Sequence, residues 1–239
     1  MAIAIVGGTG DEGFGLALRL ARAGEDVIIG SRAQDRAAAA AQKAEGILGS
    51  DVTVRGMENP EAVAGAEVVF VTVPFGGQAD TYRGLKDAWP AGTVICDCTS
   101  PLATAVGGRA WQVITPWHGS AAEQAKALLP PGARLVSGFQ TVSGEALQEL
   151  DRPMQGDVLL CGAEAEAKAT VGALVERIPE LHWVDGGPLS MARIVETFTA
   201  VLVQVNRNYG IRETGVAFTG REAWGAPPPK QARGGGADA

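Results

Sequence analysis

The chain reads Ile5-Val6-Gly7-Gly8-Thr9-Gly10-Asp11-Glu12-Gly13 near its start, and residues 8–13 fit the pattern G-x-G-x-x-G. An apolar run, Ala2 to Val6, precedes the pattern, and a helix-like run, Phe14 to Ala23, follows it. This order predicts a strand, a tight glycine turn and a helix N-terminus. Gly8, Gly10 and Gly13 would let the backbone approach a pyrophosphate, whose charge the helix N–H groups would receive. We therefore predict a dinucleotide site here rather than a glycine turn without a ligand.

The end of the second predicted strand, Asp26 to Gly30, indicates which dinucleotide binds. An NAD site has a carboxylate there, about 20 residues past the glycines, but this strand ends in Ser31-Arg32, and Arg36 follows one helical turn later. Arginine binds phosphate with two hydrogen bonds and keeps its charge. We predict that these three residues bind the 2′-phosphate of NADP, with the Thr9 hydroxyl adding a contact. A solvated helix charge is the alternative interpretation of Arg36.

Composition limits the remaining classes. The chain has 239 residues, of which 46% are hydrophobic, and a formal net charge of −7. The acidic charge argues against nucleic acid as a partner. No apolar run approaches the ~20 residues that span a bilayer. We expect no signal peptide, no metal site, and three buried, unpaired cysteines in a reducing cytoplasm.

Strand-like and helix-like stretches alternate along the first part of the chain, which predicts an α/β fold, a Rossmann-type doubly wound parallel sheet. The expected strands are residues 2–6, 27–30, 52–55, 67–74, 93–98 and 134–139, and the expected helices are residues 14–23, 35–48, 77–89 and 120–129, the last with Ser120 as N-cap and Glu123 in the capping-box position. Residues 1–138 would form this NADP-binding domain. Residues 139–219 would form a smaller C-terminal α/β domain containing strands 157–162 and 182–185, a helix 163–178 and a long helix from Pro188 to Asn208. Residues 220–239 are rich in proline and glycine, and we predict that they are disordered.

Together these motifs resemble those of the NADPH-dependent coenzyme F-420 reductases, also called F-420:NADP oxidoreductases. The resemblance covers most of residues 1–215 and rests on the glycine stretch 7–15, Ile29-Gly30-Ser31-Arg32, Val71-Thr72-Val73-Pro74, Gly187-Pro188-Leu189, Val195-Glu196 and Asn206. It implies hydride exchange between NADP(H) and the deazaflavin ring of F-420, stacked together in a cleft between the domains. It also implies that Thr9, Ser31, Arg32 and Arg36 hold the NADP phosphates, and that Val73 and Pro74 border the nicotinamide. Stacking is the main requirement for such a transfer, so no acid–base residue is required.

One position departs from the family pattern. Gln140, a candidate catalytic residue, stands where family members usually carry a histidine; glutamine can hydrogen-bond a ring but cannot protonate one near neutral pH. A reductase of a small carbonyl or imine therefore stays open as an alternative, with His118, in the loop between residues 99 and 120, as candidate proton donor. A loop histidine without a role is the plainer interpretation of His118. A non-catalytic NADP-binding protein is the third possibility, since the fold alone does not decide function.

Two further expectations concern partners. F-420 carries a phosphate and an oligoglutamate tail, so an acidic protein that binds it should have a local basic patch. The candidates are Arg83, Arg109, Arg193, Arg207 and Arg212. The apolar residues of the long helix cover more than one narrow stripe, from which we predict a homodimer that uses this helix.

Overall fold

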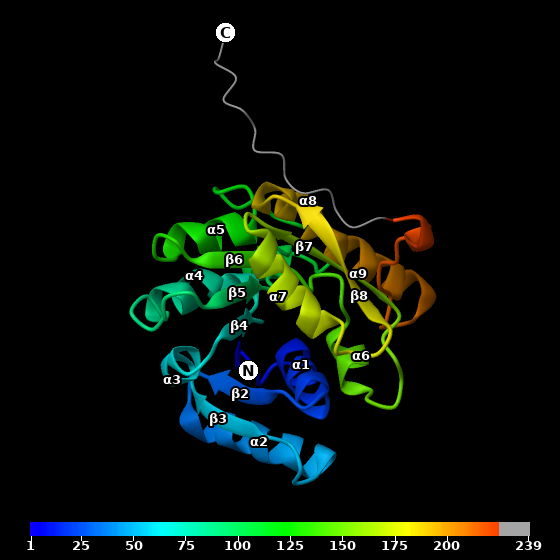
Figure 1. The fold of residues 1–239 in the computed structure, drawn as a ribbon. Coiled ribbons are helices and arrows are strands. Elements are labelled where there is room, and N and C mark those ends of the chain that lie inside the picture. The colour runs from blue at the N-terminus through cyan, green and yellow to red at the C-terminus, as the bar shows by residue number, and fades with distance from the viewer. Residues whose placement is uncertain (225–239) are drawn as a thin grey trace.

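The structure is a computed structural model and describes residues 1–224. Its strands are β1 (Ala2–Val6), β2 (Asp26–Ser31), β3 (Val54–Glu58), β4 (Val68–Val71), β5 (Val94–Asp97), β6 (Arg134–Ser137), β7 (Gly156–Gly162) and β8 (Leu181–Gly187). They form one sheet in the order β3-β2-β1-β4-β5-β6-β7-β8 (Figure 1). Every neighbouring pair is parallel except β6 and β7. The predicted doubly wound Rossmann-type sheet is confirmed.

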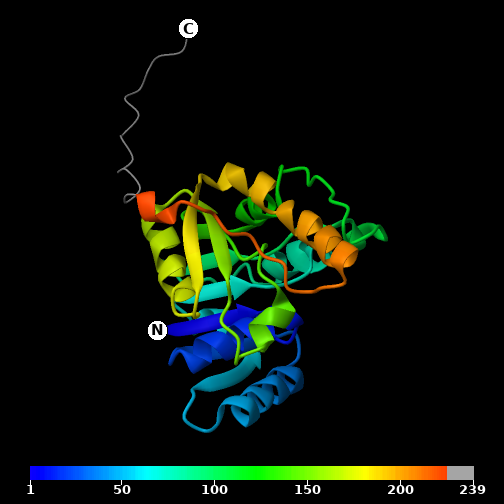
Figure 2. The same cartoon turned by 90° about the vertical axis from the view of Figure 1, so that its right-hand side faces the viewer.

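Helices cover both faces of this sheet. They are α1 (Asp11–Arg22), α2 (Gln34–Leu48), α3 (Asn59–Ala64), α4 (Phe75–Gly84), α5 (Ala121–Leu128), α6 (Gly144–Gln148), α7 (Ala165–Val175), α8 (Ala192–Val195) and α9 (Phe198–Tyr209), with short 3₁₀ turns η1 (Ala103–Val106), η2 (Leu189–Met191) and η3 (Arg221–Ala223). Helices α1, α2, α6 and α7 contribute to the core on one face, and α3, α4, α5 and α8 to the core on the other. Figure 2 shows α9 crossing the side of the molecule.

The alternation of side chains along each strand explains these two cores. In β1, Ile3 and Ile5 point into the core under α1, whereas Ala4 and Val6 point into the core under α3. All four side chains are fully buried. A strand that is covered on both faces has no polar face, which is why the central strands read as continuous apolar runs.

The C-terminal part of the chain continues the same sheet. Strand β7 pairs antiparallel with β6 through Ser137 and Cys161, and β8 adds to β7 in parallel. Residues predicted for a second domain therefore share a sheet with the first, and the division into two domains at residue 138 stays a prediction. The predicted disordered tail differs in part, because Arg221 donates to the Asp157 carboxylate and the Trp183 carbonyl. Residues 225–239 of that tail lie outside the described residues.

Several helix predictions differ from the structure. The single long helix from Pro188 to Asn208 is wrong: the turn η2 comes first, and a tight turn at Glu196 and Thr197 separates α8 from α9. In this turn Thr197 N donates to Ile194 O at 3.2 Å, a bond across three residues, and the Thr197 hydroxyl donates to the same oxygen. Helix α4 ends at Gly84, five residues before the predicted end, and the short helices α3 and α6 were not predicted.

All three cysteines are free and buried, as predicted. Within residues 1–224 no helix has both the length and the apolar character needed to cross a bilayer.

Candidate functional site

A cleft of about 750 Å³ lies at the carboxyl ends of β1, β2 and β4. Its lining comes from the glycine turn, the end of β2, the start of α3, the end of β4 and one side of α4. Among the lining residues are Gly7, Thr9, Gly10, Ser31, Arg32, Arg36, Glu58, Asn59, Thr72, Val73, Pro74, Gly76, Gly77, Asp80 and Thr81. Ligands of open parallel sheets bind at this edge, where the connections to neighbouring strands diverge. The structure thus brings seven of the nine predicted cofactor-binding residues to one cleft.

The remaining two predicted residues, Gly8 and Gly13, lie beneath the cleft and permit close packing. A Cβ atom on Gly8 would stand 2.7 Å from Ile5 O, and one on Gly13 would stand 2.8 Å from Gly8 Cα and collide with Thr72 Oγ1. Gly7 has a φ of +80°, the left-handed conformation that glycine adopts without strain. These positions let helix α1 start directly against β1 and β4.

The N-terminus of α1 faces this glycine turn without a capping side chain. Gly10 is the N-cap residue, and no side chain accepts from the first turn. The first N–H groups of a helix have no partner within it, and they carry the positive end of the helix dipole. A pyrophosphate fits such a place because its oxygens accept from these groups.

The end of β2 supplies hydroxyl and guanidinium groups. Ser31 is buried, whereas Arg32 and Arg36 are exposed at the mouth of the cleft. Within residues 1–224, neither arginine has a carboxylate partner. Two arginines left without an internal counter-charge fit a phosphate ligand.

The end of β4 forms the inner wall of the cleft. The Thr72 hydroxyl donates to Val6 O at 3.1 Å and ties β4 to β1. Val73 is half-buried, and its Cγ1 would stand only 2.9 Å from a Cβ on Gly7, so valine and the glycine turn pack closely. Pro74 is exposed in the lining.

A buried polar network lies behind this wall. The Asp97 carboxylate at the end of β5 accepts from the Tyr82 hydroxyl at 2.8 Å and from the Gln78 amide at 2.9 Å. Burial raises the pKa of Asp97 despite these bonds. Gln78 also donates to Ala121 O and accepts from Gln124, so the network joins α4, β5 and α5. It fixes the position of α4, which forms one side of the cleft.

Glu12 and Asn59 border the cleft region and were missed by the sequence analysis. Burial, followed by the nearby Asp97, raises the pKa of Glu12 to about 8, so this carboxyl is mainly neutral at pH 7. Its Oε1, like Oδ1 of Asn59, is buried and without a hydrogen-bond partner in the described part of the chain. A neutral Glu12 removes the repulsion that a carboxylate beside the glycine turn would exert on a phosphate. The sequence pattern gave no sign of this, because the burial comes from distant segments.

Neither of the two candidate catalytic residues lines this cleft. His118 is exposed in the loop before α5 and does not line the cleft. Gln140 is buried, and its amide donates to Asp97 O at 3.0 Å and to Ser137 Oγ at 2.9 Å. These contacts tie the ends of β5 and β6 together, so Gln140 supports the fold at this edge, and a catalytic role for it stays a prediction.

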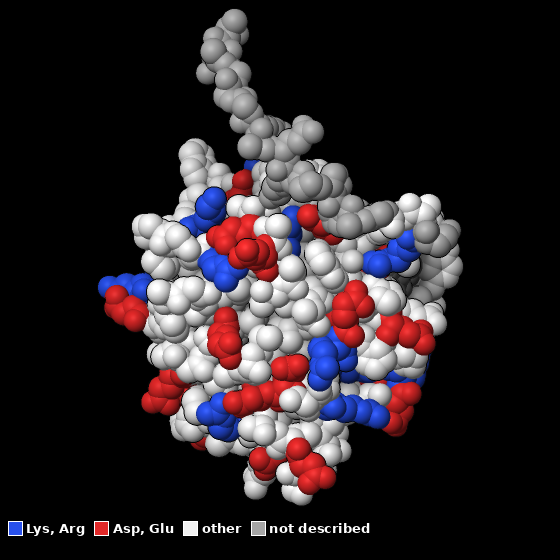
Figure 3. Space-filling model, in the orientation of Figure 1, with Lys and Arg blue, Asp and Glu red and all other residues white. Residues whose placement is uncertain are grey.

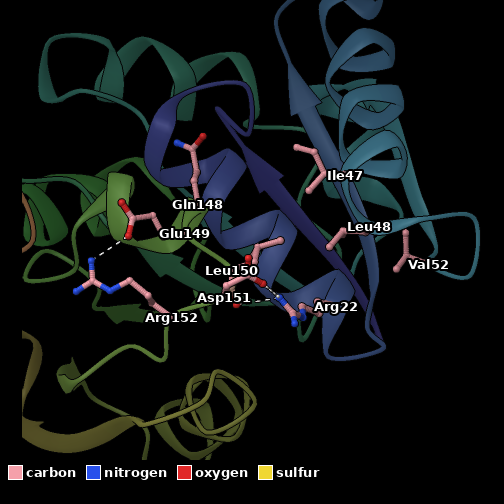
Figure 4. A pocket seen from close by; sticks show the side chains of 9 residues that line it. All are labelled: Arg22, Ile47, Leu48, Val52, Gln148, Glu149, Leu150, Asp151 and Arg152. Atoms are coloured by element: carbon pink, nitrogen blue, oxygen red, sulfur yellow. Dashed lines mark hydrogen bonds and ion pairs between the residues drawn. The ribbon is translucent and has the colours of Figure 1, made fainter.

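A second hollow, of about 780 Å³, lies between α1, α2 and the segment after α6 (Figure 4). Arg22 on its wall donates to Leu150 O at 2.8 Å, and Arg152 pairs with Glu149. Its charged groups therefore have partners already. Most of its lining comes from the end of α6 and the segment after it, Gln148 to Arg152, and Arg22, Ile47 and Leu48 come from the C-terminal ends of α1 and α2. These two helix ends return to the amino edge of the sheet, away from the ligand edge.

Comparisons with known proteins find relatives that match almost the whole chain. The family model described as "NADP oxidoreductase coenzyme F420-dependent" matches residues 2–101. The chain is 40% identical to the F420-dependent NADP reductase of Methanothermobacter thermautotrophicus, over 92% of this chain and 95% of that protein. It is 39% identical to the enzyme of the same name from Methanocaldococcus jannaschii, over 93% of this chain and 100% of that one. A crystal structure of a putative F420-dependent NADP-reductase from Arthrobacter sp. FB24 has the same fold, with a TM-score of 0.72 at 22% identity, covering 91% of this chain and 98% of that chain.

Proposed function

Because the chain belongs to the F420-dependent NADP reductase family, we propose that it exchanges a hydride between NADP(H) and the deazaflavin coenzyme F-420. The observation that carries this proposal is the cleft itself. A glycine turn, an uncapped helix N-terminus and two arginines that have no counter-charge among residues 1–224 line one hollow at the ligand edge of the sheet. This combination fits a dinucleotide that ends in a phosphorylated ribose.

Different residues of the cleft bind different parts of the dinucleotide. The first N–H groups of α1 receive the pyrophosphate, and Thr9 lies beside them. Ser31, Arg32 and Arg36 bind the 2′-phosphate, since guanidinium groups form paired, charge-assisted hydrogen bonds with phosphate oxygens. Val73 and Pro74 border the nicotinamide with apolar surface that excludes water.

The deazaflavin ring of F-420 binds between the wall formed by Val73 and Pro74 and helix α9. The Thr99 hydroxyl donates to Val73 O at 3.3 Å, and the Ser100 and Thr199 hydroxyls lie 2.6 Å apart. These contacts bring the start of α9 next to the nicotinamide side of the cleft. With both substrates bound, the reduced nicotinamide gives its hydride to the deazaflavin, which also takes one proton from water. The protein's contribution is to hold the two rings aligned and close together.

The proposal is tested by mixing purified protein with NADPH and oxidised F-420. We expect the visible absorbance of the oxidised deazaflavin to disappear, with NADH giving a much lower rate. A titration that shows NADPH binding, together with unchanged deazaflavin absorbance across a pH series, would contradict the proposal.

We also propose a homodimer that uses α8 and α9. Ile194 on α8 and Val201 on α9 are 51% and 56% exposed. Glu196 and Thr197 in the turn between them keep right-handed helical dihedrals, so residues 194 and 201 face a similar direction although the turn interrupts the helix. Exposed apolar side chains grouped on one surface indicate a protein contact. The three free, buried cysteines fit a reducing compartment, and we propose the cytoplasm.

A further inference from the structure

Among the described residues, arginines without a carboxylate or carbonyl partner occur at two places in the molecule. Within residues 1–224, most arginines have a carboxylate partner, and Arg19 donates to backbone carbonyls of α6. On the face drawn in Figure 3, most basic groups likewise lie against acidic ones. Four described arginines lack such a partner: Arg32, Arg36, Arg109 and Arg207. The first two line the dinucleotide cleft, so the other two call for an explanation.

Arg109 and Arg207 share one aromatic ring. The guanidinium of Arg207, near the end of α9, lies 4.2 Å from the ring centroid of Trp111, and that of Arg109 lies 5.2 Å from it. Cation–π contacts of this kind hold a guanidinium in place while its N–H groups stay free to donate. We name these three residues the arginine–tryptophan cluster.

The loop that carries Trp111 is internally bonded, so the cluster is held in a fixed arrangement. Ala103 N donates to Gln112 O at 2.8 Å, and Ile114 N donates to Pro101 O at 2.9 Å. The turn at its tip is closed by Gln112 N donating to Arg109 O at 3.0 Å and by Arg109 N donating to the Gln112 side chain. These bonds place Arg109 and Trp111 at the tip, against α9.

Helix α9 runs from the nicotinamide side of the cleft to the arginine–tryptophan cluster. Thr199, at the start of α9, contacts Ser100, which follows the Thr99 hydroxyl bonded to Val73 O. From Thr199 to Arg207 the helix rises eight residues, about 12 Å. A ligand whose ring stacks beside Val73 and whose tail runs along α9 therefore reaches the cluster.

We propose that the arginine–tryptophan cluster binds the anionic tail of the second substrate, resting on the proposed function for the identity of that substrate. The tail of F-420 carries a phosphate and several carboxylates, and an arginine pair matches both chemistries. The acidic protein would otherwise repel such a tail, since its net charge is −7. Of the other basic candidates, Arg83, Arg193 and Arg212 are paired with Asp80, Glu123 and Glu145.

The test compares F-420 with the deazaflavin that lacks the whole tail, in wild type and in Arg109→Gln, Arg207→Gln and the double variant. We expect KM for F-420 to rise about tenfold for each arginine removed, the effect of about 1.4 kcal/mol. KM for the tail-less deazaflavin and for NADPH should stay within about twofold. A form of F-420 that keeps the phosphate but lacks the glutamates separates the two sources of charge. If the arginine substitutions raise its KM as much as that of F-420, the cluster binds the phosphate. If they do not raise it, the cluster binds the glutamates.

Two variants serve as controls. Arg134→Gln removes the same charge from a pair with Glu164 at the amino edge of the sheet, and KM should not change. Arg207→Lys keeps the charge but loses the planar stack, so it should fall between wild type and Arg207→Gln.

Fluorescence titration of F-420 in the absence of NADPH gives a readout that does not need turnover. If the wild type reduces neither deazaflavin but binds F-420 through these arginines, the proposed function fails and the tail site stands. Equal losses for the tailed and tail-less forms, or no loss for either, would overturn the tail site while leaving the proposed function intact.

Discussion

At the scale of single residues, the arginines at the end of β2 decide between the two nicotinamide coenzymes. Arg32 lines the cleft and has no carboxylate partner among the described residues. We expect Arg32→Glu to lower the ratio of kcat/KM for NADPH to that for NADH by about 100-fold or more, because a carboxylate there repels the 2′-phosphate and accepts from a free ribose hydroxyl. Arg55 pairs with Asp26 and does not line the cleft, so Arg55→Glu is the control for the effect of charge reversal itself. An unchanged ratio in Arg32→Glu would remove the phosphate assignment.

The glycines of the turn make separate contributions to folding and binding. In Gly13→Ala the new methyl group would collide with Thr72 Oγ1 and approach Gly8 Cα to 2.8 Å, so we expect a loss of about 1–3 kcal/mol in the free energy of unfolding. In Gly10→Ala the nearest atom is Gly7 O at 3.5 Å, so stability should fall less than in Gly13→Ala, by the cost of alanine at the N-cap alone, while the new methyl group crowds the pyrophosphate and weakens NADPH binding. Denaturant melts and NADPH titrations of both variants distinguish the two effects. Equal stability of the two variants would contradict this division.

His118 gives a prediction of no effect. It is exposed and lies outside the cleft lining, so His118→Ala should leave kcat and KM for F-420 and NADPH within about twofold of wild type. A fall of tenfold or more in kcat, with KM for NADPH unchanged, would restore His118 as a proton donor and favour a substrate that needs one.

At the scale of elements, one carboxylate joins two helices. Glu196, in the turn between α8 and α9, is fully buried and accepts from Ala121 N at 2.8 Å and Ala122 N at 3.0 Å, the first N–H groups of α5. The Ser120 hydroxyl accepts from Glu123 N in the same turn, which confirms the predicted N-cap. The bonds of Glu196 span more than 70 residues of sequence, which explains why the helix pattern alone did not predict the interruption.

This arrangement predicts how stability depends on pH. Burial, more than Asp97 and Glu123, raises the pKa of Glu196 to about 8, against the lowering effect of the two N–H donors. In the unfolded chain the carboxyl loses its proton near pH 4.5, so between about pH 4.5 and 8 the folded state holds the proton more tightly. Stability contributed by Glu196 is therefore present at low pH and decreases as pH rises through this window.

Two substitutions test the pH effect in denaturant melts at pH 5.5, 7 and 9. Glu196→Gln should show a smaller loss of stability from pH 5.5 to 9 than wild type, because it has no proton to lose. Glu196→Ala should be less stable at every pH by about 1–3 kcal/mol, since it leaves two buried N–H groups unpaired. Parallel curves for wild type and Glu196→Gln would contradict the raised pKa.

At the scale of the whole molecule, local patterns predicted the sheet but not its completion. The apolar runs and the glycine turn predicted β1 to β6 and placed Thr9, Ser31, Arg32, Val73 and Pro74 at one edge, because parallel strands end on the same side. Their ligand roles stay predictions. The joining of β7 and β8 to the same sheet depends on the Ser137–Cys161 pairing between distant segments. Likewise, the buried Asp97 network and the neutral Glu12 arise only when helices far apart in sequence pack together.

The dimer is the last property that belongs to the whole molecule. Ile194 and Val201 expose apolar surface on α8 and α9, whereas Arg207 lies six residues after Val201, about 120° away around the helix. A second copy can therefore cover the apolar side while the arginine–tryptophan cluster stays open. We expect light scattering at micromolar concentration to give the dimer mass for wild type and the monomer mass for the double variant Ile194→Glu/Val201→Glu, because burying two carboxylates opposes association. Ile47→Glu changes an equally exposed isoleucine on α2 and should remain dimeric. A monomeric wild type would refute the dimer. A double variant that stays dimeric would move the contact to another surface.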